Sequence, residues 1–184
     1  MFILTFFVKT CIDIYVMLLL LRIWMQWVRS DFYNPFSQFV VTMTQPVVIQ
    51  LRRIVPSVGP IDSASLLLAF VLMAIKHPLL LLVQGGSMEL GPYNLLFGFL
   101  SLIKATGHLI FWTMMLRSLM SWISQGQGPM DYVLYQLTEP LMSPLRRIIP
   151  VMGGIDFTGM AVILILYLLN ALGMNMFAGI WILL

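Results

Sequence analysis

Residues 44–62 read TQPVVIQLRRIVPSVGPID, and residues 138–156 read TEPLMSPLRRIIPVMGGID. The two stretches lie 94 positions apart, and ten of the 19 aligned residues are identical. Upstream the offset becomes 95, so that Lys9 corresponds to Lys104 and Arg22 to Arg117. Self-similarity at a fixed period is the signature of a repeated structural unit. We therefore expect a duplication, with residues 1–90 as the first repeat and 91–184 as the second.

Two long apolar stretches flank the repeated segment in each unit. A helix needs about 20 apolar residues to cross the hydrocarbon core of a bilayer, and only a helix satisfies all backbone polar groups there within one segment. All four stretches are long enough, which predicts an all-α membrane protein with four transmembrane helices, built as a parallel duplication of a two-helix unit. The spans are expected at about residues 2–24, 63–83, 93–116 and 157–180.

The composition agrees with a membrane protein. Of the 184 residues, 60% are hydrophobic and 9% are charged, and the mean hydropathy is +0.97. A soluble domain is about a quarter charged, so a globular soluble enzyme, a disordered chain and a secreted disulfide scaffold are all excluded. Ten Lys and Arg against seven Asp and Glu give a net charge of +3, but no sustained basic run suggests direct nucleic-acid binding.

The repeated middle segment contains too many prolines for a further span. Asn34-Pro35 is typical of a helix N-cap followed by proline at the first helical position. Pro46 is expected to start a second short helix, and Pro56 to end it. The second unit repeats the pattern at Pro129, Pro140 and Pro150. Each unit thus predicts a pair of short amphipathic helices, which either lies in the membrane interface or enters and leaves the membrane as a re-entrant loop.

Charged residues mark the end of each repeated segment. Asp62 and Asp156 directly precede apolar stretches, so both are expected to cap the helices that follow. Arginine pairs beside interfacial helices set topology and bind anionic lipid headgroups, or they bind an acidic partner. The predicted lipid- or partner-binding residues are Arg52, Arg53, Arg146 and Arg147.

The distribution of Lys and Arg predicts the orientation. Both connecting segments that carry an arginine pair are basic, whereas the loop between the units, residues 84–92, contains Glu89 and neither Lys nor Arg. Because loops rich in Lys and Arg remain on the cytoplasmic side, we expect the arginine-bearing loops in the cytoplasm and both termini outside.

The repeated unit resembles the YggT family, which is related to YlmG-type proteins of Gram-positive bacteria, cyanobacteria and plastids. The family signature looks like an Arg and a Trp at the end of a span, an Asn-Pro turn, and a Thr-Glu-Pro…Pro-Leu-Arg-Arg…Pro…Gly-Gly-Asp-Phe run. Residues 138–157 are similar to this run nearly throughout. The first unit departs from it at Gln45, Gln50, Pro60 and Ser63.

The resemblance covers nearly the whole chain, and two tandem units look like the proteobacterial form of the family. It implies an integral protein of the bacterial inner (plasma) membrane that contributes to osmotic-stress tolerance and potassium homeostasis, by conducting ions or by modulating a transporter. The YlmG branch and a plastid relative imply instead a non-conducting scaffold or assembly factor, for cell division or for the biogenesis of membrane proteins. The resemblance implies no enzymatic residues.

Polar residues within the apolar stretches are the remaining candidates. An ionisable residue at membrane depth costs about 2.5–3.5 kcal/mol on insertion scales, so each invites a role in an ion path or a gate; the alternative is that a lysine extends its amine to the interface. Lys9 and Asp13 are four residues apart and could pair on one helical face. The candidates are Lys9, Asp13, Lys76, His77, Lys104 and Asn170.

No catalytic residues, metal ligands or cofactor site are expected. The chain has one cysteine and two histidines that are far apart in sequence, whereas a structural zinc site takes four clustered Cys or His ligands. The expected partners are the lipid bilayer, with anionic headgroups, and either further copies of the chain or another membrane protein, because four helices enclose little lumen.

Overall fold

The computed structural model of the protein describes residues 2–57, 59–87, 91–123, 128–149 and 157–184. Over these ranges the chain folds into helices. They are, in order, α1 (Phe2–Trp27), α2 (Pro35–Arg52), α3 (Ser63–Val83), α4 (Tyr93–Ile123), α5 (Pro129–Arg146), α6 (Thr158–Met176) and α7 (Ala178–Leu183).

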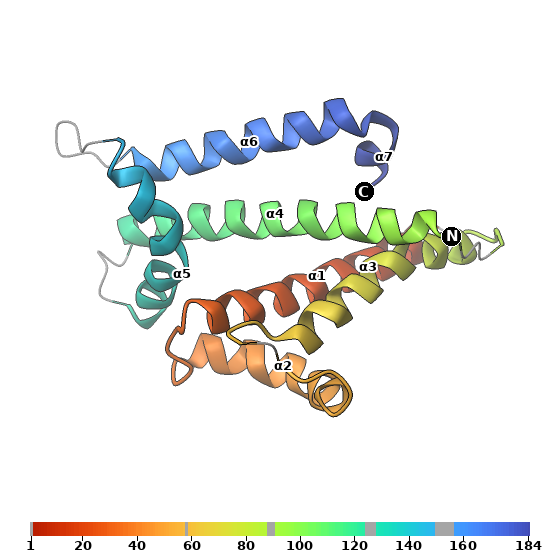
Figure 1. Ribbon diagram of the computed structural model, residues 1–184, viewed down its shortest axis with the longest axis horizontal. Coiled ribbons are helices and arrows are strands. Elements are labelled where there is room, and N and C mark those ends of the chain that lie inside the picture. Colours follow the sequence, from red (N-terminus) through yellow and green to blue (C-terminus); the bar gives the residue numbers. More distant parts are fainter. Residues whose placement is uncertain (1, 58, 88–90, 124–127, 150–156) are drawn as a thin grey trace.

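Four of these helices, α1, α3, α4 and α6, are long and apolar enough to cross a membrane. Figure 1 shows them running lengthwise, each antiparallel to the one before, with α2 and α5 toward one end and α7 toward the other. The expected four-span, all-α architecture is therefore present. Helix α4 continues well beyond the predicted end of its span at residue 116, to Ile123.

The last apolar stretch differs from the prediction of one continuous span. Helix α6 ends at Met176, Phe177 has a non-helical backbone (φ −128°, ψ 37°), and α7 begins at Ala178. In Figure 1 the chain turns back at this point, so that the C-terminus lies between α6 and α4. The reason is a set of contacts made by Trp181, described below.

The prediction of paired short helices is wrong in both units. Helix α2 runs without interruption through Pro46, and α5 runs through Pro140 and Pro144. Asn34 caps α2 as expected, accepting a hydrogen bond from the backbone N–H of Phe36 at 2.9 Å. A proline removes one backbone hydrogen bond and bends a helix without having to end it. In α2 the halves on both sides of Pro46 are held by fully buried valines, Val40 and Val48.

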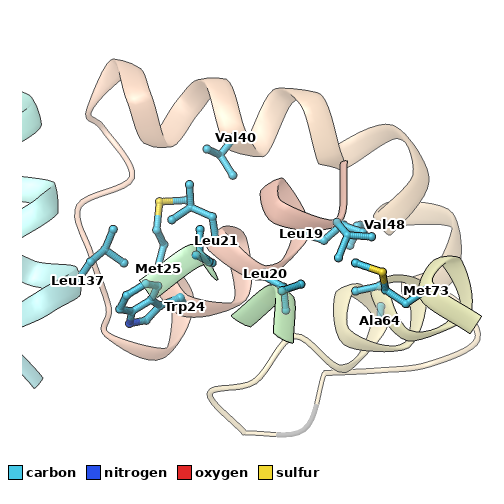
Figure 2. Packing of buried hydrophobic residues seen from close by; sticks show 14 of the residues in the cluster. Leu19, Leu20, Leu21, Trp24, Met25, Val40, Val48, Ala64, Met73 and Leu137 are labelled. Atoms are coloured by element: carbon cyan, nitrogen blue, oxygen red, sulfur yellow. The ribbon is translucent and has the colours of Figure 1, made fainter. Parts of the chain in front are cut away.

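The apolar core is centred on the second half of α1 and joins the two repeats. Figure 2 shows Val40 of α2, Met73 of α3 and Leu137 of α5 around residues of α1. Leu137 belongs to the second repeat and points toward Trp24 of the first. The central α1 residues of this core are Leu19, Leu20, Leu21, Trp24 and Met25.

Helices α3 and α4 pass close to each other at two small residues. A Cβ atom added to Gly98 of α4 would lie 2.8 Å from both Cα and Cβ of Ala74 in α3, closer than non-bonded carbon atoms approach. Small residues allow this kind of close approach between membrane helices. Gly98 thus fixes how the first repeat packs against the second.

Candidate functional site

The most connected polar site surrounds the carboxylate of Asp62, at the start of α3. Arg22 donates to Oδ2 of Asp62 from Nε at 3.2 Å, and Arg52 donates from Nη2 to Oδ2 at 2.6 Å and from Nε to Oδ1 at 3.2 Å. As the N-cap of α3, Asp62 also accepts from the backbone N–H and the hydroxyl of Ser65. This Asp62 clamp, formed by Arg22, Arg52 and Asp62, joins α1, α2 and α3.

Two of the three charges of the clamp are withdrawn from solvent, whereas the Arg52 side chain is 39% exposed. Asp62 is fully buried, and Arg22 is 5% exposed. Arg22 also donates to the Thr44 hydroxyl at 2.8 Å and to the Gln45 side-chain carbonyl at 3.4 Å, both on α2. Buried charges are tolerated when they are paired and hydrogen-bonded. The sequence of α2 therefore supplies the polar atoms that a buried arginine on α1 requires.

Electrostatics keep the Asp62 carboxyl ionised. Burial by itself raises the pKa of Asp62, but the hydrogen bonds from Arg52 and Ser65 and the positive charges of Arg52 and Arg22 outweigh burial. The pKa of Asp62 consequently lies below its usual value. The clamp is thus a charged structure at every pH near neutrality.

The second repeat contains a related network with a different carboxylate. Arg117, the counterpart of Arg22, donates to the Thr138 hydroxyl, and its Nη2 lies 3.9 Å from Oε2 of Glu139. Arg146 donates to Oε1 of Glu139 at 2.8 Å. Glu139 stands where the first repeat has Gln45, and so it bridges the two arginines of its own repeat. Asp156, the counterpart of Asp62, lies outside the described residues, as does its expected capping role.

The structure separates the members of each predicted arginine pair. Arg52 and Arg146 bind carboxylates within the protein, although Arg52 is itself exposed, and Arg53 and Arg147 are exposed as well. Sequence analysis missed the importance of Arg22 and its counterpart Arg117. The available signal was their equivalence in the two repeats together with the shared threonine, Thr44 or Thr138, that each arginine contacts.

Within the spans, the sequence predicts that Asp13 pairs with Lys9, but Asp13 pairs with Lys76 instead. The distance from Lys76 Nζ to Asp13 Oδ1 is 2.6 Å, which ties α3 to α1. Lys9 is exposed on α1. A partner on the same helix was expected from spacing alone, but packing places the α3 lysine nearer to the carboxylate. His77 packs its ring against Phe97 of α4, with ring centroids 4.9 Å apart.

Two further polar candidates are brought together by Trp181 of α7. The Lys104 amine donates to the Trp181 carbonyl at 2.8 Å, and the Trp181 indole N–H donates to the Asn170 side-chain carbonyl at 2.9 Å. The Trp181 ring lies against Gly173, where a Cβ atom would come within 2.6 Å of it. These contacts seat α7 between α4 and α6, and they explain why the last apolar stretch is not one straight helix.

The corresponding positions of the two repeats hold different polar structures. Asp13 and Lys76, which form the ion pair of the first repeat, correspond to His108 and Asn170 in the second. His108 and Asn170 line a largely apolar cavity of about 530 Å³ between α4, α6 and α7. The first repeat thus has an ion pair at the two positions that line a cavity in the second.

Comparisons with known proteins agree with this architecture. The family model described as CCB3/YggT matches residues 1–83 and 96–177. The chain is 50% identical to "Uncharacterized protein YggT" of Escherichia coli K12, with 97% of each chain covered. It is 48% identical to a protein of Vibrio alginolyticus, with 96% of each chain covered. It is 38% identical to a protein of Haemophilus influenzae, over 96% of this chain and 94% of that one.

No solved structure matches the chain. The family model covers most of both halves of the chain, in two segments that are consistent with two tandem repeats. The resemblance noted from the sequence motifs is thereby confirmed, and the chain belongs to the CCB3/YggT family.

Proposed function

We propose that the protein is a non-enzymatic, non-conducting component of the bacterial inner membrane that supports osmotic-stress tolerance and potassium homeostasis by modulating a transporter. The observation that supports it is that three cations of the spans have partners within the protein. Lys76 pairs with Asp13, Lys104 donates to the Trp181 carbonyl, and Arg22 pairs with Asp62. Cations bound in this way hold helices together, which argues against a role in an ion path; Lys104 also lines the cavity between α4, α6 and α7, and Lys9 is exposed.

The surface of the spans agrees with binding to another membrane protein. Only 6% of the apolar window of α6 is buried inside the molecule, and 17–22% of the corresponding windows of the other three spans. Lipid or a partner must therefore cover most of this surface. Because lipid tails are as apolar as leucine side chains, a partner is recognised in the membrane by packing and by polar contacts. Lys9, which is exposed on α1, gives a partner one such polar contact.

The proposal is tested first by ion flux. Purified protein in proteoliposomes is expected to give no potassium or sodium flux above that of empty vesicles, in the wild type and in the Lys9→Ala and Lys104→Ala variants. Flux by the wild type that the lysine substitutions alter would contradict the proposal and would establish conduction along the first span of each repeat.

The second arm is a test in cells that lack the protein. They are expected to grow poorly at high osmolarity and to take up potassium more slowly, and the wild-type chain is expected to restore both. Crosslinking from positions on α6 then identifies the protein that it contacts. Normal potassium uptake together with a division defect, or with loss of an assembled membrane complex, would favour the scaffold or assembly function instead.

A further inference from the structure

A pocket of about 580 Å³ opens beside the Asp62 clamp, between the last turns of α1 and the first half of α2. Its wall contains two guanidinium groups and four neutral side chains that are able to form hydrogen bonds. These six residues are Arg22, Gln26, Gln38, Thr42, Arg52 and Ser57. The wall also includes two apolar residues, Phe32 and Val41. The pocket therefore combines donors for an anion with a larger apolar surface.

The pocket carries an excess of one positive charge. Arg22 and Arg52 share the single carboxylate of Asp62, and the other lining residues are uncharged. A guanidinium group has five N–H donors. The bonds to Asp62, Thr44 and Gln45 use three donors of Arg22, and the bonds to Asp62 use two of Arg52. Each arginine retains N–H groups that are available to an anion.

Two positions near this pocket carry larger or acidic side chains in the second repeat. Tyr135 occupies the position that corresponds to Val41, and its ring lies against the guanidinium of Arg117, 5.1 Å from the ring centroid. Glu139 occupies the position of Gln45 and neutralises Arg146. A larger side chain and an added carboxylate thus stand at two positions where the first repeat has Val41 and Gln45. Other residues that line the pocket, such as Gln38 and Thr42, also differ between the repeats.

We propose that the pocket binds the phosphate of an anionic phospholipid, with Arg22 and Arg52 as the phosphate ligands. The pocket lies at the end of the α1 span, at the depth of the lipid headgroups, where arginine clusters bind anionic lipids. Phe32 and Val41 contact the apolar part of the lipid next to the phosphate. A zwitterionic headgroup fits less well, because its cationic group would be repelled by the net positive charge that Arg22 and Arg52 give the pocket.

The test measures the binding of phosphatidylglycerol and of phosphatidylcholine to the purified protein by native mass spectrometry. Loss of charge-assisted hydrogen bonds to one phosphate corresponds to a loss of affinity of about tenfold or more. We therefore expect the wild type to prefer phosphatidylglycerol, and Val41→Tyr and Gln45→Glu each to lower its affinity for that lipid by about tenfold. Both substitutions copy the side chain that the second repeat has at the same position, so each is compatible with this fold.

Matched controls on the same helix separate the pocket from general effects. Val47→Tyr adds the same ring and Gln50→Glu the same charge at exposed positions that do not line the pocket, and both are expected to bind phosphatidylglycerol as the wild type does. Equal binding by all five proteins would overturn the proposal, as would an equal loss in the controls. Binding of inorganic phosphate to the lipid-free protein is measured as well, because it distinguishes a site for a soluble anion from a site for a lipid headgroup. If phosphate binds the lipid-free protein and Val41→Tyr abolishes that binding, the site takes a soluble anion and the lipid assignment is wrong.

Discussion

At the scale of single residues, Asp62 is the group on which the first repeat depends most. It is one fully buried carboxylate between two arginines, and it also caps α3. Its position before an apolar stretch predicts the cap. Its pairing with Arg22, which is 40 residues away in the sequence, has no local signal, because long-range pairing depends on how the helices pack.

Replacement of this carboxylate is expected to destabilise the protein strongly. Asp62→Asn leaves Arg22 buried without a counterion, and breaking a buried ion pair in this way costs about 3–5 kcal/mol. The thermal unfolding midpoint of the purified variant should fall well below that of the wild type. Asp31→Asn, at an exposed position, is the matched control and should unfold near the wild-type temperature. Equal midpoints for the two variants would show that the clamp does not hold the helices together.

The lowered pKa of Asp62 predicts how stability depends on pH. The unfolded chain releases the Asp proton near pH 4, and the folded chain releases it at a lower pH. Stabilisation by this group is therefore fully present above about pH 4 and is lost as the pH falls through the folded pKa. The difference between the unfolding midpoints of the wild type and Asp62→Asn should become smaller as the pH is lowered from 7 to 3. A constant difference between them would contradict the prediction.

At the scale of the elements, hydropathy predicts the spans well and predicts the ends of helices poorly. Residues 63–83 form α3 as predicted, because burial in lipid and backbone hydrogen bonding both favour a helix there. Pro46 does not end α2, since Val40 and Val48 pack on both sides of it. The break before α7 follows from side-chain contacts of Trp181, which no local pattern reveals.

The seating of α7 is expected to depend on the absence of a side chain at Gly173. In Gly173→Leu the new side chain would overlap the Trp181 ring, so Trp181 loses its contacts with Asn170 and Lys104. Amide hydrogen exchange of residues 178–183 should become much faster in this variant. Gly179→Ala is the control, because a Cβ atom there has no neighbouring atom within 4 Å, and its exchange should match the wild type. Unchanged exchange in Gly173→Leu would show that other contacts hold α7.

At the scale of the whole molecule, the repeats have the same order of helices but different interiors. The similarity of residues 44–62 to 138–156 predicts a common architecture, and α1, α2 and α3 have counterparts in α4, α5 and α6. It does not predict that two positions form an ion pair in the first repeat and line a cavity in the second. Such differences arise at positions that the repeats do not share, such as Asp13 and His108.

The orientation of the whole chain remains a prediction from charge, and cysteine labelling tests it. With Cys11 replaced by alanine, single cysteines are introduced at Ser57, after α2, and at Ser87, between the repeats; both positions are exposed. A membrane-impermeant maleimide applied to intact cells should label Ser87→Cys at once, and Ser57→Cys only after the inner membrane is opened. The reverse pattern would place the arginine-bearing segments outside.

The order of residues within the Asp62 clamp has a consequence for how the chain is assembled during synthesis. Both arginines leave the ribosome before Asp62 does, so the two ion pairs of the clamp cannot form until the start of α3 has been made and has reached the membrane; before that, Arg22 can bind α2 only through Thr44 and Gln45. In the second repeat Glu139 precedes Arg146 and follows Arg117, so its bridge is complete before α6 exists. The ion pairs of the first repeat are therefore completed only when its last helix is made, whereas the ion pairs of Glu139 in the second repeat can form before its last helix is made.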